Sequence, residues 1–196
     1  LKIMFPMISG VEELRRAKAI LEEAKVELSD RHVPYNVALE VGAMIEVPSA
    51  ALTSDILSHE VSFFSIGTND LIQYSLAVDR TNEKIAYLYE PTHPAVIRLI
   101  KSVIEAGHKS NIWVGMCGEM SGEPSLAVLL LGLGLDEFSM PSVSIPEIKH
   151  VIRSVTFAQA KEIADEALTL STGAEVEDFI NKKLQDILPG FYENQA

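Results

Sequence analysis

Four polar side chains each follow an apolar run with the length of a β-strand: Glu46, Asn69, Asp70 and Cys117. In parallel α/β folds, ligands bind at the carboxyl ends of the strands. We therefore expect two carboxylates, one carboxamide and one thiol to lie on the same face of a sheet.

Glu46 and Asp70 would come from neighbouring strands. Mg²⁺ prefers hard oxygen ligands and commonly uses one or two carboxylates together with substrate phosphate and water. Each residue also has a simpler interpretation, because Glu46 could be an exposed acid at a strand end and Asp70 a helix cap. Taken together, the two residues support metal binding and these structural roles about equally.

Gly67-Thr68-Asn69-Asp70 precedes a helical pattern. The free backbone amides and the positive dipole end of a helix start favour an anion, although an ordinary capped helix start has the same letters. Arg80 follows this helix and could bind a carboxylate or a phosphate through two parallel hydrogen bonds. A salt bridge with Asp79, or a charge at the C-terminal end of the helix, is the simpler interpretation of Arg80.

Cys117 is the single cysteine and is followed by Gly118. A thiol is mostly protonated at neutral pH, so it can donate a proton to carbon or attack as a thiolate. A buried, inert cysteine is the alternative. The five histidines fall in helical or connecting segments and are expected to be solvated.

Apolar runs alternate with helical patterns along the first part of the chain. The predicted strands are 2–7, 37–47, 62–66, 112–117 and 137–140. The predicted helices between them are 11–28, 49–57, 70–78, 94–106 and 124–132, with Gly107 and Gly132 or Gly134 as exits. A βα unit repeated five times predicts a parallel sheet.

Three more helices are predicted at 145–155, 157–170 and 176–188. We therefore expect one α/β domain over residues 1–196, with βα units to about residue 142 and a helical part from about residue 143. Five strands are too few to close an eight-stranded barrel. An open doubly wound sheet and the later part of a (β/α) barrel both remain possible.

Composition excludes several classes of protein. The 196 residues carry 28 acidic and 16 basic side chains, a formal charge of −12, which argues against unaided binding to nucleic acid or an anionic membrane. One cysteine permits no internal disulfide and suggests a reducing cytoplasm, and no apolar run reaches the roughly 20 residues of a membrane span. The start at Leu1 without an initiator methionine suggests a fragment.

The stretch from Phe63 to Arg80 resembles the signature of phosphoenolpyruvate-utilising enzymes. Within that family, the chain is most similar to the phosphoenolpyruvate–protein phosphotransferases, the Enzyme I group of the bacterial phosphotransferase system. Segments 3–7, 42–48, 115–119 and 131–140 also resemble that group, in the same order.

The resemblance implies a (β/α)₈ TIM-type barrel, of which this chain holds about the last five βα units and the C-terminal helices. It also implies that Glu46 and Asp70 hold Mg²⁺ and that Asn69, Asp70 and Arg80 bind phosphoenolpyruvate. Cys117 corresponds to the proton donor that converts the enol to pyruvate.

By the same resemblance, the phosphoryl group passes to a histidine of an N-terminal domain outside this sequence and then to HPr, during sugar uptake. The family pattern also implies a homodimer and further phosphate-binding arginines on earlier strands, so we expect the segment alone to be inactive. Two alternatives remain: the corresponding domain of pyruvate phosphate dikinase or phosphoenolpyruvate synthase, and a dimerisation fragment without catalysis.

Overall fold

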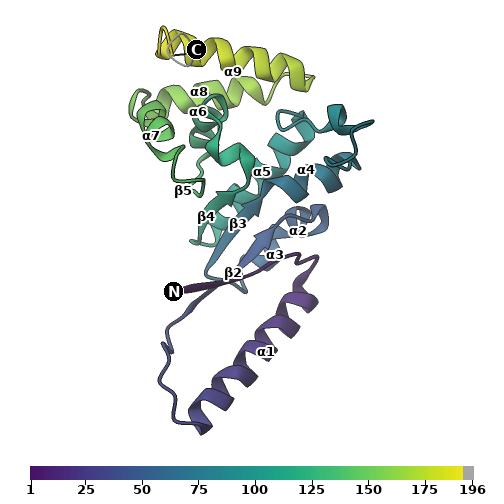
Figure 1. Cartoon of the computed structure of the whole chain (residues 1–196), viewed down its shortest axis with the longest axis vertical. Helices are drawn as coiled ribbons and strands as arrows, with labels where there is room; N and C mark the ends of the chain where they lie inside the picture. The colour runs from purple at the N-terminus through teal and green to yellow at the C-terminus, as the bar shows by residue number, and fades with distance from the viewer. Residues whose placement is uncertain (192–196) are drawn as a thin grey trace.

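The computed structural model describes residues 1–191 of the chain. Its centre is a five-stranded parallel sheet (Figure 1). The strands are β1 (Lys2–Phe5), β2 (Glu40–Ile45), β3 (Phe63–Gly67), β4 (Trp113–Cys117) and β5 (Glu137–Phe138). Each strand lies within or beside a run predicted from the sequence, and β5 is the shortest.

The strands lie in the sheet in the order β1-β2-β3-β4-β5. A doubly wound sheet would reverse its strand order at a switch point, so the chain does not adopt that alternative. Every neighbouring pair is parallel. Within residues 1–191 the sheet is open, with β1 and β5 at its two edges.

Helices or short helical turns follow each of the first four strands. They are α1 (Val11–Asp30), α2 (Pro48–Leu52), α3 (Ser54–Leu57), α4 (Thr68–Leu76), η1 (Ala86–Leu88), α5 (Pro94–Lys109), η2 (Glu119–Gly122) and α6 (Pro124–Leu133). Pro94 and Pro124 lie in the first turns of their helices, as predicted. The single helix expected over 49–57 is divided in two at Thr53.

Of the glycines predicted to end helices, Gly134 does so and Gly107 does not. Gly134 has a φ of 96° and ends α6, in the left-handed conformation that glycine adopts without strain. The exit predicted at Gly107 is wrong, because this residue lies buried inside α5. A Cβ there would come within 2.5 Å of the Val114 side chain, so the missing side chain lets α5 pack closely on β4.

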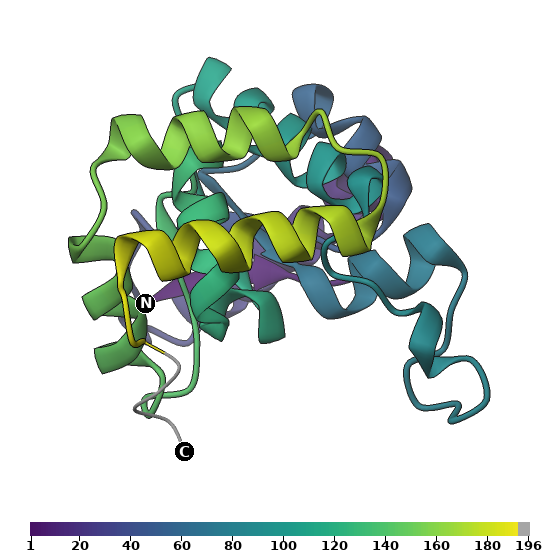
Figure 2. The same ribbon diagram turned by 90° about the horizontal axis from the view of Figure 1, so that it is seen from above.

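Three further helices follow β5: α7 (Ile145–Arg153), α8 (Phe157–Ala167) and α9 (Gly173–Ile187). They lie at the opposite end of the molecule from α1 (Figure 1), and Figure 2 shows α8 and α9 side by side. Thr156 with Gln159, and Thr172 with Glu175, form capping boxes that define where α8 and α9 begin.

The core has two connected parts. All five residues of β3 are buried, as expected for a parallel strand covered on both faces. α6 is almost entirely buried and packs most extensively on α8, where Ala127, Ala160 and Ile163 belong to a second apolar cluster. No helix within residues 1–191 is long and apolar enough to cross a membrane.

The closest approach of α6 to α8 depends on Gly132. A Cβ at this position would collide with the backbone carbonyl of Ala160. Alanine would gain about 1 kcal/mol of helix propensity, but overpacking against backbone costs about 1–3 kcal/mol. We expect Gly132→Ala to lower the free energy of unfolding by about 1 kcal/mol in urea titrations, the balance of these two effects. Gly10→Ala, where a Cβ meets nothing within 4 Å, is the control, and equal stability of the two variants would contradict this packing argument.

Candidate functional site

Parallel register brings the ends of three strands to one edge of the sheet. Ile45 of β2 lies opposite Ile66 of β3, and Gly67 of β3 lies opposite Cys117 of β4. Glu46 therefore follows β2 next to Gly67, and the first residues of α4 lie between Glu46 and Cys117. The structure thus brings together the four residues singled out from the sequence.

Glu46 is a buried carboxyl group, with only 4% of its surface exposed. Its Oε1 accepts a hydrogen bond of 2.7 Å from the backbone N–H of Met7, which has a φ of 54°. A Cβ on Gly67 would lie 2.6 Å from Glu46 Oε2, so glycine is needed at the end of β3 to leave room for the carboxylate. The interpretation of Glu46 as an exposed strand-end acid is wrong.

Glu46 and Asp70 interact directly. Burial raises the pKa of Glu46, the Met7 N–H opposes that rise, and the charge of Asp70 and a hydrogen bond with it raise the pKa further. Asp70 lies in the first turn of α4 and does not cap it, since the N-cap is Gly67. A divalent cation between the two carboxylates would relieve their repulsion, so this oxygen pair fits Mg²⁺. Residues 1–191 contain no cluster of three or more potential protein ligands.

Cys117 is held at the end of β4 by two contacts from the β3–α4 segment. The Ser65 hydroxyl donates to Cys117 Sγ at 3.7 Å, and the Thr68 hydroxyl donates to the Cys117 carbonyl at 3.2 Å. Because Sγ accepts from Ser65, the thiol hydrogen remains available for donation. Cys117 is half-buried, which differs from the fully buried, inert cysteine considered as the alternative.

The turn after Cys117 brings Asn69 against the backbone. Gly118 has a φ of 102°, and a Cβ there would collide with Thr68 and Asn69. Asn69 Oδ1 accepts a 3.1 Å hydrogen bond from the Glu119 N–H, which fixes the orientation of the carboxamide. Asn69 and Cys117 line a hollow of about 450 Å³ that extends toward Met140, large enough for a small ligand.

Arg80 forms an ion pair with Glu119, with 2.8 Å between Nη1 and Oε1. The simpler interpretation of Arg80 as a partner of Asp79 is wrong, because the Asp79 carboxylate accepts from Thr81. Arg80 and Tyr89 both lie in the segment that connects α4 to α5. This segment projects away from the sheet in Figure 2. Burial, followed by the charge of Glu119, raises the pKa of Tyr89 to about 12, although Arg80 opposes the shift.

Gln73 of α4 connects two of the predicted site residues. Its Nε2 donates to Asp70 Oδ1 at 3.1 Å, and its Oε1 accepts from the Arg80 N–H at 2.9 Å. Sequence reasoning assigned no role to Gln73, Tyr89 or the Met7 N–H. The position of Gln73 inside the stretch from Phe63 to Arg80 was the only feature of the sequence that could have pointed to it. Nothing in the sequence distinguishes Tyr89 from other tyrosines.

The histidines are solvated as expected: His108 is exposed and His93 is only partly covered, and both also have a polar partner. His93 caps α5 by accepting from the Ala95 N–H, and His108 lies 2.8 Å from Asp136. Neither lines the hollow beside Cys117.

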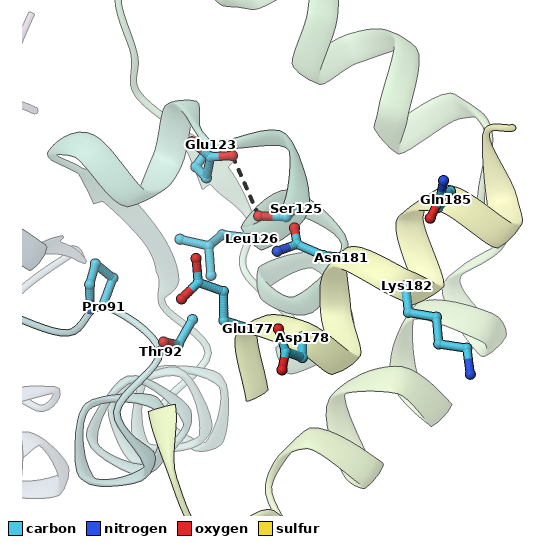
Figure 3. A pocket seen from close by; sticks show the side chains of 10 residues that line it. All are labelled: Pro91, Thr92, Glu123, Ser125, Leu126, Glu177, Asp178, Asn181, Lys182 and Gln185. Carbon is cyan, nitrogen blue, oxygen red and sulfur yellow. Dashed lines mark hydrogen bonds between the residues drawn. The ribbon is translucent and has the colours of Figure 1, made fainter. Parts of the chain in front are cut away.

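A larger hollow, of about 710 Å³, lies between the start of α6 and α9 (Figure 3). Its walls include Glu123 and Ser125 from the first of these regions and Glu177 from the second. None of the four strand-end residues lines it, so the larger hollow is separate from the candidate site.

The raised pKa of Glu46 has a consequence for stability. Between the ordinary glutamate pKa of about 4 and the higher folded value, the folded chain binds a proton that the unfolded chain has lost. The contribution of Glu46 to the free energy of unfolding therefore falls as the pH rises through that interval, and it stays lower at higher pH. We expect metal-free Glu46→Gln to be more stable than the parent at pH 7, with the difference disappearing below about pH 4.

Urea unfolding at a series of pH values measures this difference. Glu23→Gln, an exposed position on α1, is the matched control and should leave stability unchanged. A loss of stability at pH 7 for Glu46→Gln would show that its carboxylate is favourably solvated in the folded chain.

Comparison with known proteins bears on this site. The protein with 52% identity over 184 residues, from Haemophilus influenzae, is a phosphoenolpyruvate-protein phosphotransferase, and the alignment covers 94% of this chain and 32% of that protein. Its counterparts from Priestia megaterium and Staphylococcus carnosus are 52% and 48% identical, over 92% and 93% of this chain and 31% and 32% of their own lengths. This chain therefore spans about a third of the length of these relatives.

A solved structure of a citrate lyase from Burkholderia xenovorans has a TM-score of 0.56 and 17% identity to this chain. It covers 94% of this chain and 63% of the lyase chain, and this likeness concerns the fold alone. Residues 1–157 match the family model of the PEP-binding domain of PEP-utilising enzymes. Together with the relatives at about 50% identity, that match shows that the chain belongs to the family of phosphoenolpyruvate-utilising enzymes and contains their phosphoenolpyruvate-binding domain.

Proposed function

We propose that this chain is the phosphoenolpyruvate-binding part of a phosphoenolpyruvate–protein phosphotransferase, with Glu46 and Asp70 as ligands of Mg²⁺. The observation that carries the proposal is the burial of Glu46 against Asp70, at the same sheet edge as Cys117. Two acids placed in this way are costly without a cation. The names of the relatives favour this activity over the dikinase and synthase alternatives.

The complete enzyme would contain more than this chain. We propose that the five sequential βα units are part of a (β/α)₈ barrel and that residues 1–196 belong to one domain. The proposed acceptor is a histidine of a separate N-terminal domain, which passes the phosphoryl group to HPr in the cytoplasm. We further propose that the working enzyme is a homodimer.

Substrate binding follows from the groups around the two carboxylates. Mg²⁺, when bound, supplies a Lewis acid for the enolate and phosphoryl oxygens. The Asn69 carboxamide is already oriented by Glu119 and can contact the substrate. Arg80 can bind phosphate or carboxylate through two hydrogen bonds once it leaves Glu119. Gly67 provides no side chain to cap α4, so the first N–H groups of that helix can also face an anion.

The thiol of Cys117 is proposed as the proton donor. When the P–O bond of phosphoenolpyruvate breaks, the phosphoryl group forms a bond to the acceptor histidine and leaves the enolate of pyruvate. An electron pair from the enolate double bond takes the thiol proton at the methylene carbon, which gives pyruvate and a thiolate. The thiolate regains a proton from water. Ser65 supports this role because its hydroxyl donates to Sγ and leaves the S–H hydrogen free.

The metal assignment predicts coupled binding. Calorimetry of the full-length protein should show that Mg²⁺ tightens phosphoenolpyruvate binding. The reason is that the metal ion would neutralise the negative charges of both the carboxylates and the substrate. Replacing both Glu46 and Asp70 by alanine should abolish that effect. Glu22→Ala with Glu23→Ala, on the exposed face of α1, provides a control of equal charge change. Unchanged metal dependence in the Glu46/Asp70 double variant would remove the basis of the proposed site.

The proton-donor assignment predicts a selective defect. Cys117→Ala in the full-length protein should slow pyruvate formation about 10²–10⁴-fold, the usual contribution of a positioned general acid. Phosphoenolpyruvate affinity should change little. Steady-state assays of pyruvate release and equilibrium dialysis measure the two quantities, and normal pyruvate release would rule out this role for Cys117.

A further inference from the structure

Gln73 occupies a central position between the carboxylate and the arginine of the site. Its side-chain amide donates to Asp70 Oδ1 at 3.1 Å and accepts from the Arg80 N–H at 2.9 Å. A side-chain amide offers a donor N–H group and an acceptor oxygen side by side. Glutamate could only accept at neutral pH, and methionine would do neither effectively.

The main chain of Gln73 also organises the turn that leads to Arg80. Its carbonyl accepts from the N–H groups of Ala77 and Val78 at the end of α4. Ala77 adopts a left-handed conformation with a φ of 52°, which redirects the chain after the helix. Gln73 therefore contacts the turn through both its backbone and its side chain, seven residues before Arg80.

We propose that Gln73 is a positioning residue that couples Asp70 to the Arg80 turn, an inference that rests on the proposed function of these two residues. When Asp70 is held in place by a cation, the Gln73 amide is held with it, and its Oε1 stays directed at the Arg80 backbone. The Arg80 guanidinium then starts from a fixed backbone position when it exchanges Glu119 for the substrate. Loss of the amide should weaken both metal binding and phosphoenolpyruvate binding.

Gln73→Met in the full-length protein tests the coupling, because it keeps the unbranched length of the side chain and removes both hydrogen bonds. Gln185→Met on the exposed face of α9 is the matched control. Free Mn²⁺ is measured by electron paramagnetic resonance, and phosphoenolpyruvate binding at saturating Mn²⁺ by calorimetry. We expect Gln73→Met to weaken Mn²⁺ binding about tenfold, as is usual when a partner of a metal ligand is removed, and to weaken phosphoenolpyruvate binding as well.

The number of Mn²⁺ ions bound at saturation separates positioning from a merely structural role. A positioning defect raises the dissociation constant and leaves that number unchanged, whereas partial unfolding lowers the number. Equal Mn²⁺ dissociation constants for Gln73→Met and Gln185→Met would overturn the inference, as would a lower number of sites with an unchanged constant. If Gln73→Met has no effect, Asp70→Asn shows which hypothesis has failed. Unchanged Mn²⁺ affinity in Asp70→Asn as well would refute the metal assignment itself. Weaker Mn²⁺ binding in Asp70→Asn would refute only the role of Gln73.

Discussion

The repulsion between two carboxyl groups is the constraint on which the candidate site depends. Glu46 is buried against Asp70, and burial together with the neighbouring charge raises the pKa of Glu46. Two features make this burial possible: the Met7 N–H donates a hydrogen bond to Glu46, and Gly67 has no side chain that would collide with the carboxyl group. Such an arrangement lowers the stability of the metal-free protein, and a divalent cation between the two carboxyl groups would relieve their repulsion.

The surrounding contacts control orientation. Gly118 has no side chain and therefore allows Asn69 to approach the β4 turn, while Ser65 and Thr68 fix Cys117. The ion pair with Glu119 holds the Arg80 side chain beside the turn that follows β4. Ser65 lies within β3 and Cys117 ends β4, and the other groups come from the segments that follow these two strands. The carboxyl ends of the strands are where a parallel sheet gathers its functional side chains.

The sequence predicted the strand positions well because buried parallel strands appear as short apolar runs. β3 is the clearest example, with all five residues buried. Helix ends were less certain. Gly107 was expected to end a helix and instead lies inside α5, because the reason for that glycine is a contact with Val114 that is distant in sequence. Local propensity contains no information about such a contact.

The sequence by itself determined the alternation of strands and helices, the family, and the presence of Glu46, Asn69, Asp70 and Cys117 at strand ends. Only the tertiary structure decided the sequential strand order, the burial of Glu46 and the pairing of Arg80 with Glu119 instead of its neighbour Asp79. The physical reason is that residue type and spacing fix which groups face the same edge of the sheet. Burial, charge coupling and hydrogen-bond partners depend on which segments meet there, and that is set by packing between residues far apart in the chain.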